Sequence, residues 1–135
     1  MVRQDVLPLN DLKRPTILLA DDYVALHDII RRVLEPEFEV VGTVDNGLTL
    51  IDAAIRLTPD IIISDISMPL VSGLEALRQL MVIRPDVRFI FLTVDKEPAV
   101  VEEAKRAGAA GYVDKTRTDF ELLPAIRKAL QEGEF

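Results

Sequence analysis

The stretch Asp60–Gly73, DIIISDISMPLVSG, joins a short apolar run to a carboxylate and then to a sharp turn. Three successive isoleucines followed by Ser64 are typical of a strand that is covered on both faces. Asp65 stands where this strand ends, and Pro69 and Gly73 interrupt regular structure soon after it. Because an unpaired charge at the end of a buried strand is costly, the fold has to bring other groups to this place.

Apolar runs of similar length recur along the chain and predict five strands, at Thr16–Ala20, Phe38–Val44, Ile61–Ser64, Arg88–Thr93 and Gly111–Asp114. The segments between and after these runs have apolar residues at helical spacing, in Leu26–Val33, Leu48–Leu57, Leu74–Ile83, Val100–Ala107 and Leu122–Leu130. Strands that alternate with helices predict an α/β fold, in which right-handed crossovers build a parallel sheet with helices on both faces.

The first helical segment carries the only histidine of the chain, His27. Leu26, Ile29, Ile30 and Val33 fall on one face of this helix, which we expect to be the buried face. His27 falls on the opposite, polar face together with Asp28, Arg31 and Arg32. We therefore expect His27 to be a surface residue and not a metal ligand.

Composition restricts the classes of function. The 135 residues suffice for one domain with a sizeable core, and the absence of cysteine excludes disulfides and thiolate sites. A formal net charge of −7 argues against direct binding of nucleic acid by this domain. No apolar segment resembles a signal peptide or a membrane span, so we expect a cytoplasmic protein.

Polar side chains stand at the carboxyl ends of four predicted strands: Asp21 and Asp22, Asp65, Thr93, and Lys115. In doubly wound sheets these strand ends meet at one edge, where ligands bind. Three neighbouring carboxylates repel one another unless a cation neutralises them. A site with only two or three carboxylate ligands, and room for water, suits Mg²⁺. Lys115 and Thr93 add a positive charge and a hydrogen-bond donor, which suit a phosphoryl group.

The motifs ILLADDY, IISDISMP, FLTV and GYVDK, in this order and spacing, resemble the receiver domain of bacterial two-component response regulators. The resemblance spans residues 15–132 and implies a flavodoxin-like, doubly wound sheet of strand order 2-1-3-4-5 with five helices. Residues 1–14 are then an N-terminal extension that we expect to be flexible, and residues 133–135 begin a linker. The final run LLPAIRKALQEGEF resembles the last receiver helix of regulators that continue into a helix-turn-helix domain.

The resemblance also implies roles for the residues at the strand ends. Asp65 would accept a phosphoryl group from a sensor histidine kinase or a phosphotransfer protein. Asp22, Asp65 and the backbone carbonyl of Ser67 would bind Mg²⁺ directly, and Asp21 would act through water. Lys115 and Thr93 would contact the phosphoryl oxygens.

Conformational switching is the second function that the resemblance implies. Thr93 would move toward the phosphoryl group, and Tyr112 would turn into the space that it leaves. The face made by the fourth helix, the fifth strand and the fifth helix would then bind a partner or a second copy of the chain.

Several residues depart from the commonest pattern of the family. Val94 follows the switch threonine where alanine or glycine is usual, and we expect its branched side chain to narrow access to Asp65. Ser67 and Asp95 occupy positions that tune hydrolysis of the acyl phosphate. Thr116 replaces the proline that often follows the lysine with a cis bond, so the isomer of the Lys115–Thr116 bond stays open.

Other classes of protein share parts of this pattern. A haloacid-dehalogenase-type phosphatase also uses a strand-end aspartate with Mg²⁺ and lysine, but its second aspartate is absent from Asp65-Ile66-Ser67. A nucleotide-binding module needs a glycine-rich loop after the first strand, where this chain has Asp21-Asp22. A receiver that serves only for docking would not need the full acidic set.

Overall fold

The computed structural model describes residues 14–132, which form one parallel sheet of five strands. The strands are β2 (Thr16–Ala20), β3 (Glu39–Val44), β4 (Ile61–Ser64), β5 (Arg88–Thr93) and β6 (Gly111–Asp114). Their order in the sheet, β3-β2-β4-β5-β6, is the predicted order 2-1-3-4-5, and all four pairings are parallel. The flavodoxin-like, doubly wound fold is therefore confirmed.

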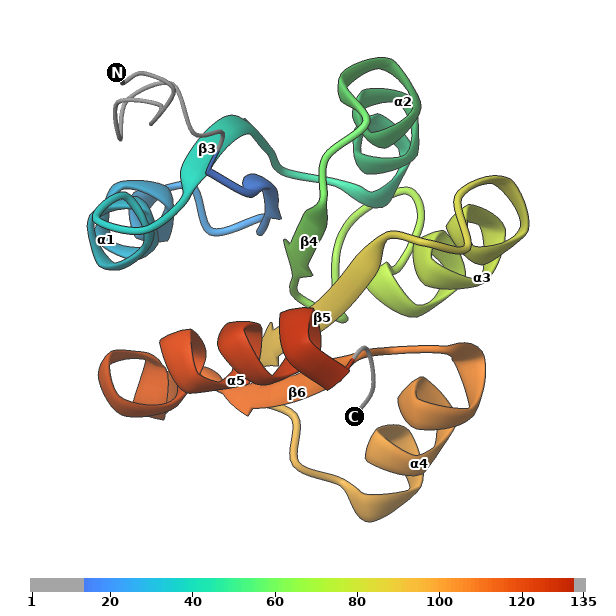
Figure 1. Cartoon of the computed structure of the whole chain (residues 1–135). Coiled ribbons are helices and arrows are strands. Elements are labelled where there is room, and N and C mark those ends of the chain that lie inside the picture. The colour runs from blue at the N-terminus through green and yellow to red at the C-terminus, as the bar shows by residue number, and fades with distance from the viewer. Residues whose placement is uncertain (1–13, 133–135) are drawn as a thin grey trace.

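The helices cover both faces of the sheet (Figure 1). They are α1 (Ala25–Leu34), α2 (Gly47–Leu57), α3 (Gly73–Ile83), α4 (Pro98–Ala107) and α5 (Thr118–Glu132), with a short 3-10 helix η2 at Lys115–Arg117. Figure 1 shows α1 and α5 on one side of the strands and α2, α3 and α4 on the other. Five of these are the α-helices that the apolar spacing predicted.

Alternate side chains of the strands fill two separate cores. Leu18, Ile62, Phe89 and Phe91 pack under α2, α3 and α4. Residues of the opposite parity, such as Leu19, Ile63 and Ile90, pack under α1 and α5. All four side chains of β4 are buried, because helices cover this central strand on both faces.

The first turn of α1 differs from the sequence prediction. His27 is buried, with 8% of its surface exposed, and its Nε2 lies 2.8 Å from the backbone oxygen of Asp21. Ile29, which we expected on the buried face, is 52% exposed. The prediction was wrong because the buried residues of α1 are His27, Ile30 and Leu34, so the buried face is centred on the His27 side of Ile30 and Ile29 lies away from it.

The sheet directs the carboxyl ends of all its strands to one edge, as the strand order requires. Asp21 and Asp65 follow β2 and β4, which are neighbours, and Lys115 follows the edge strand β6. Except for Arg14, the predicted N-terminal extension lies outside the described residues, as does the predicted linker at 133–135. No helix within residues 14–132 has the length and apolar character that crossing a membrane requires.

Candidate functional site

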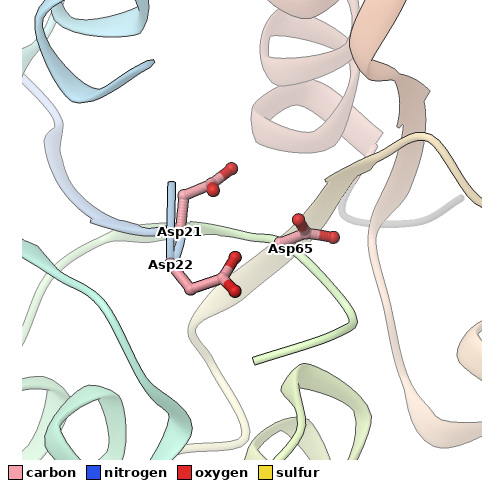
Figure 2. Close-up of side chains that lie close together, drawn as sticks. All are labelled: Asp21, Asp22 and Asp65. Atoms are coloured by element: carbon pink, nitrogen blue, oxygen red, sulfur yellow. The ribbon is translucent and has the colours of Figure 1, made fainter. Parts of the chain in front are cut away.

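Three aspartates gather at the carboxyl edge of the sheet. One ligand oxygen from each of Asp21, Asp22 and Asp65 lies within 4.8 Å of the others. Figure 2 shows that two of the carboxylates come from the loop after β2 and the third from the loop after β4. Asp21 is buried, Asp22 is exposed and Asp65 lies between these extremes, so the cluster is open to solvent on the side of Asp22.

Lys115 provides the positive charge of this cluster. Its Nζ donates hydrogen bonds to Oδ2 of Asp21 at 2.7 Å and to Oδ2 of Asp65 at 2.8 Å. All three side chains are at most 15% exposed, which limits screening by water. Burial alone would lower the pKa of Lys115, but the hydrogen bonds to Asp21 and Asp65 outweigh it and hold the pKa above its usual value.

The backbone holds Asp65 in a fixed position. Its N–H donates to the carbonyl of Ala20 at 3.0 Å, and its Oδ1 accepts the N–H of Ile66 at 2.7 Å. The hydroxyl of Ser64 donates to the Asp65 carbonyl oxygen at 2.7 Å. Each carboxylate oxygen thus has a donor, Ile66 for Oδ1 and Lys115 for Oδ2.

The loop from Ile66 to Ser72 turns back against Asp65. Gly73, at the start of α3, donates its N–H to the Ile66 carbonyl at 2.7 Å, and a Cβ on it would lie 2.0 Å from the Asp65 carbonyl oxygen. Glycine is therefore required here for close approach. Leu70 in the same loop has a φ of +69° although it is not glycine.

The donor set fits Mg²⁺. Hard cations of this size take oxygen ligands from one or two carboxylates and keep several waters. Asp22 and Asp65 offer such carboxylates, and Ser67 lies two residues beyond Asp65 in an exposed loop. Asp21 is 1% exposed and accepts bonds from Lys115 and from the N–H of Tyr23 at 2.8 Å, so it is less accessible to a metal than the exposed Asp22.

Thr93 and Tyr112 lie on neighbouring strands. Thr93 is buried at the end of β5, and its hydroxyl accepts the N–H of Asp95 at 3.3 Å. The Tyr112 hydroxyl donates to the carbonyl oxygen of Asp95 at 2.6 Å. Burial, reinforced by the charges of Asp95 and Asp65, raises the pKa of Tyr112 to about 12.

The residues expected to tune access to Asp65 differ in exposure. Val94 is 64% exposed and Ser67 is also exposed, whereas Asp95 is partly buried and accepts the N–H of Glu97 through Oδ1. That Val94 slows the entry of a phosphodonor stays a prediction. Within residues 14–132 every peptide bond is trans, including that between Lys115 and Thr116.

Asp114 is a residue that the sequence reasoning missed. One of its oxygens accepts both the N–H of Thr116 at 2.9 Å and the Thr116 hydroxyl at 2.8 Å. The other lies 2.8 Å from Nζ of Lys96. The available signal was an aspartate two residues before a threonine, a pairing that commonly forms a local turn.

Comparison with known proteins identifies the family to which the chain belongs. The family described as "Response regulator receiver domain" matches residues 17–127. Transcriptional regulatory protein DegU of Brevibacillus brevis is 33% identical over 121 residues, covering 88% of this chain and 51% of DegU. Response regulator UvrY of Escherichia coli K12 is 36% identical over 113 residues, covering 82% of this chain and 52% of UvrY. The chain thus spans about half the length of these relatives.

A solved structure shares the fold. The response regulator domain of Thermotoga maritima CheB superimposes with a TM-score of 0.82 at 30% sequence identity. The match covers 88% of this chain and 98% of that one.

Proposed function

Because this chain belongs to the response regulator receiver domain family, we propose that Asp65 accepts a phosphoryl group from a histidine kinase or a phosphotransfer protein. A carboxylate oxygen of Asp65 attacks the phosphorus of a phosphohistidine. A P–O bond forms, the P–N bond breaks, and the imidazole leaves and takes up a proton. The product is an acyl phosphate on Asp65.

The observation that carries this proposal is the contact of Lys115 with two carboxylates. Its Nζ lies 2.7 Å from Asp21 and 2.8 Å from Asp65 in a poorly exposed site. An ammonium placed there stabilises the charge that an incoming phosphoryl group brings to Asp65. The hydrogen bond from Ile66 to Oδ1 fixes the orientation of the carboxylate, which reduces the entropy lost in reaching the reactive geometry.

Asp22, Asp65 and the carbonyl of Ser67 would hold Mg²⁺, and Asp21 would contact it through water. When bound, the metal offsets the negative charge of the phosphoryl oxygens. The protein itself orients the Asp65 carboxylate, supplies the Lys115 charge and offers the Thr93 hydroxyl as a donor. Val94, Ser67 and Asp95 would set access to the acyl phosphate and its hydrolysis.

Phosphorylation would change the conformation through Thr93 and Tyr112. The phosphoryl group offers the Thr93 hydroxyl a new acceptor, and movement of Thr93 alters the space beside β6. The Tyr112 hydroxyl already contacts the β5–α4 loop at Asp95, so this loop responds to the ring position. The affected surface is the α4–β6–α5 face, through which we propose that the domain binds a partner or forms a homodimer. The extent of the response is set by the difference in phosphoryl affinity between the two conformations.

The whole protein would act through a second region. The relatives that this chain matches over half their length include a transcriptional regulatory protein. We therefore propose that a region beyond residue 132 binds DNA, in the cytoplasm, and that the acidic receiver domain itself binds no nucleic acid.

The phosphoryl transfer is tested with acetyl phosphate and Mg²⁺, followed by intact-protein mass spectrometry. We expect one phosphoryl group on the chain without substitutions and none on the Asp65→Asn variant, because an amide is not a nucleophile of comparable strength. Asp60→Asn is the matched control, since Asp60 lies at the opposite end of β4 and bonds Thr16. Labelling of Asp65→Asn at the normal rate would exclude Asp65 as the acceptor.

The switch is tested by sedimentation with and without beryllofluoride and Mg²⁺. We expect beryllofluoride to strengthen self-association of the unmodified chain, and Thr93→Ala to abolish this effect while phosphorylation continues. An unchanged sedimentation coefficient together with an unchanged Tyr112 environment would contradict the switch.

A further inference from the structure

Asp114, the last residue of β6, joins two loops at the edge of the site. Its Oδ1 accepts the N–H and the hydroxyl of Thr116, at 2.9 and 2.8 Å. Its Oδ2 pairs with Lys96 at 2.8 Å. The Asp114 side chain is only 16% exposed, so the carboxylate is held between the two loops and is not free in solvent.

The bonds to Thr116 set the direction in which the chain leaves β6. They cap η2, the 3-10 helix at Lys115–Arg117, at its first residues. The Thr118 hydroxyl donates to the Lys115 carbonyl at 2.7 Å and fixes the other side of the same turn. Lys115 is the first residue of this turn, and its side chain spans from there to Asp21 and Asp65.

The bond to Lys96 reaches the β5–α4 loop. Lys96 directly follows Asp95, whose carbonyl oxygen accepts the Tyr112 hydroxyl. Its side chain is 68% exposed, and an ion pair with so exposed a partner contributes little to stability. We therefore assign the positioning of Lys115 to the Thr116 bonds, and to Lys96 only the link with the β5–α4 loop. Hydrogen bonds from Lys96 and Thr116 lower the pKa of Asp114 to about 2, so the carboxylate stays charged at neutral pH.

We propose that Asp114 is a positioning residue, which keeps Lys115 directed at Asp65 and links that lysine to the β5–α4 loop beside Tyr112. The proposal rests on the proposed function of Asp65 as the phosphoacceptor. Asp114 would thus form a second connection between the phosphorylation site and the α4–β6–α5 face. This connection runs along the backbone from Lys115 to Asp114 and then through the Asp114 carboxylate to the β5–α4 loop.

The test separates the two oxygens of Asp114. Asp114→Ala removes both contacts, Asp114→Asn keeps an amide oxygen for Thr116, and Lys96→Met removes only the ion pair. We expect Asp114→Ala to slow phosphorylation by acetyl phosphate about fivefold, the ratio that corresponds to loss of one helix cap. Asp114→Asn and Lys96→Met should phosphorylate at close to the normal rate. Asp119→Ala, which removes an exposed carboxylate in the first turn of α5, is the charge-matched control and should also leave the rate unchanged.

Two spectroscopic readings distinguish positioning from a general loss of stability. The NMR signal of the Lys115 ammonium, assigned with Lys115→Arg, should shift in Asp114→Ala and be restored in Asp114→Asn. In a Tyr23→Phe background Tyr112 is the single tyrosine of a chain without tryptophan, so its fluorescence reports on the β5–α4 loop. We expect Lys96→Met and Asp114→Asn to reduce the fluorescence change that beryllofluoride produces.

Specific results would overturn the proposal. A normal rate and an unshifted Lys115 signal in Asp114→Ala would show that Asp114 does not position the lysine. If Asp114→Ala does not fold, Asp114→Asn and Lys96→Met decide, because an unchanged Tyr112 response in both would remove the link to the loop. If the chain without substitutions is not labelled on Asp65 at all, the proposed function fails first. If it is labelled and the Asp114 and Lys96 variants behave as it does, only the role of Asp114 fails.

Discussion

Replacement of Gly73 by alanine should disturb the phosphoacceptor through its own backbone. The added Cβ would lie 2.0 Å from the Asp65 carbonyl oxygen and 3.1 Å from the Ile66 Cα. Since real contacts of a Cβ are essentially never shorter than 3.0 Å, the two segments must separate by about 1.0 Å. The obstructing atoms belong to the backbone, so no side-chain rotation can relieve the overlap.

Both stability and reactivity should respond to this displacement. Overpacking of this kind costs about 2 kcal/mol, which lowers the unfolding temperature of a domain of this size by roughly 8 °C. A displacement near 1 Å at a reacting group lowers a rate by about 100-fold. We would measure thermal unfolding by circular dichroism and the rate of acetyl phosphate labelling by mass spectrometry.

Gly111→Ala is the matched control for Gly73→Ala. Gly111 is also buried, but its added Cβ would meet only the Ile90 side chain, at the ordinary contact distance of 3.4 Å. Its unfolding temperature and labelling rate should stay close to those of the unmodified chain. If Gly73→Ala matched Gly111→Ala in both measurements, close approach at Gly73 would not be what positions Asp65.

Three further predictions concern backbone strain, metal binding and pH. Leu70→Gly should raise the free energy of unfolding by about 1 kcal/mol in urea titrations, because Leu70 has a φ of +69° and is exposed, whereas Leu70→Ala should not. Asp22→Ala should raise stability in the absence of metal, because it removes a like charge from the cluster. The chain without substitutions should gain about 2.7 kcal/mol of stability at a Mg²⁺ concentration of 100 times Kd, and Asp22→Ala should lose this gain. An unchanged Mg²⁺ response in Asp22→Ala would exclude Asp22 as a ligand. The pKa of Tyr112 is raised from 10.0 to about 12, so the folded state holds its proton over a range in which the unfolded state has lost it. Stability from this group is complete below pH 10 and is lost as pH rises toward 12, and Tyr112→Phe should flatten this part of the stability profile.

The fold could be predicted in detail because its three central strands, β2, β4 and β5, are almost wholly buried. Four of the five predicted strands have the observed bounds, and the remaining one begins at Glu39, one residue later than predicted. Continuous apolar runs such as Ile61–Ile63 leave little freedom for a different boundary. The strand order of the sheet then placed Asp21, Asp65 and Lys115 at one edge, and the structure brings these side chains into contact.

Other features depended on contacts between segments distant in sequence. His27 is buried in α1 and its Nε2 lies 2.8 Å from the backbone oxygen of Asp21 in the loop after β2, a contact that the helical pattern does not contain. The role of Gly73 depends on how closely the turn after Asp65 returns to it. The contact between Asp114 and Lys96 joins two loops, and only the local half of that arrangement, from Asp114 to Thr116, leaves a trace in the sequence.

The role of Asp65 is tested most directly by locating the phosphoryl group chemically. After treatment with acetyl phosphate and Mg²⁺, reduction with borohydride converts an aspartyl phosphate to homoserine, which remains in the chain and is found by peptide mass spectrometry. We predict homoserine at position 65, and its loss when Mg²⁺ is withheld. Homoserine at position 21 or 22, or at no aspartate although acetyl phosphate and Mg²⁺ are supplied, would contradict the assignment of Asp65 as the phosphoacceptor of this domain.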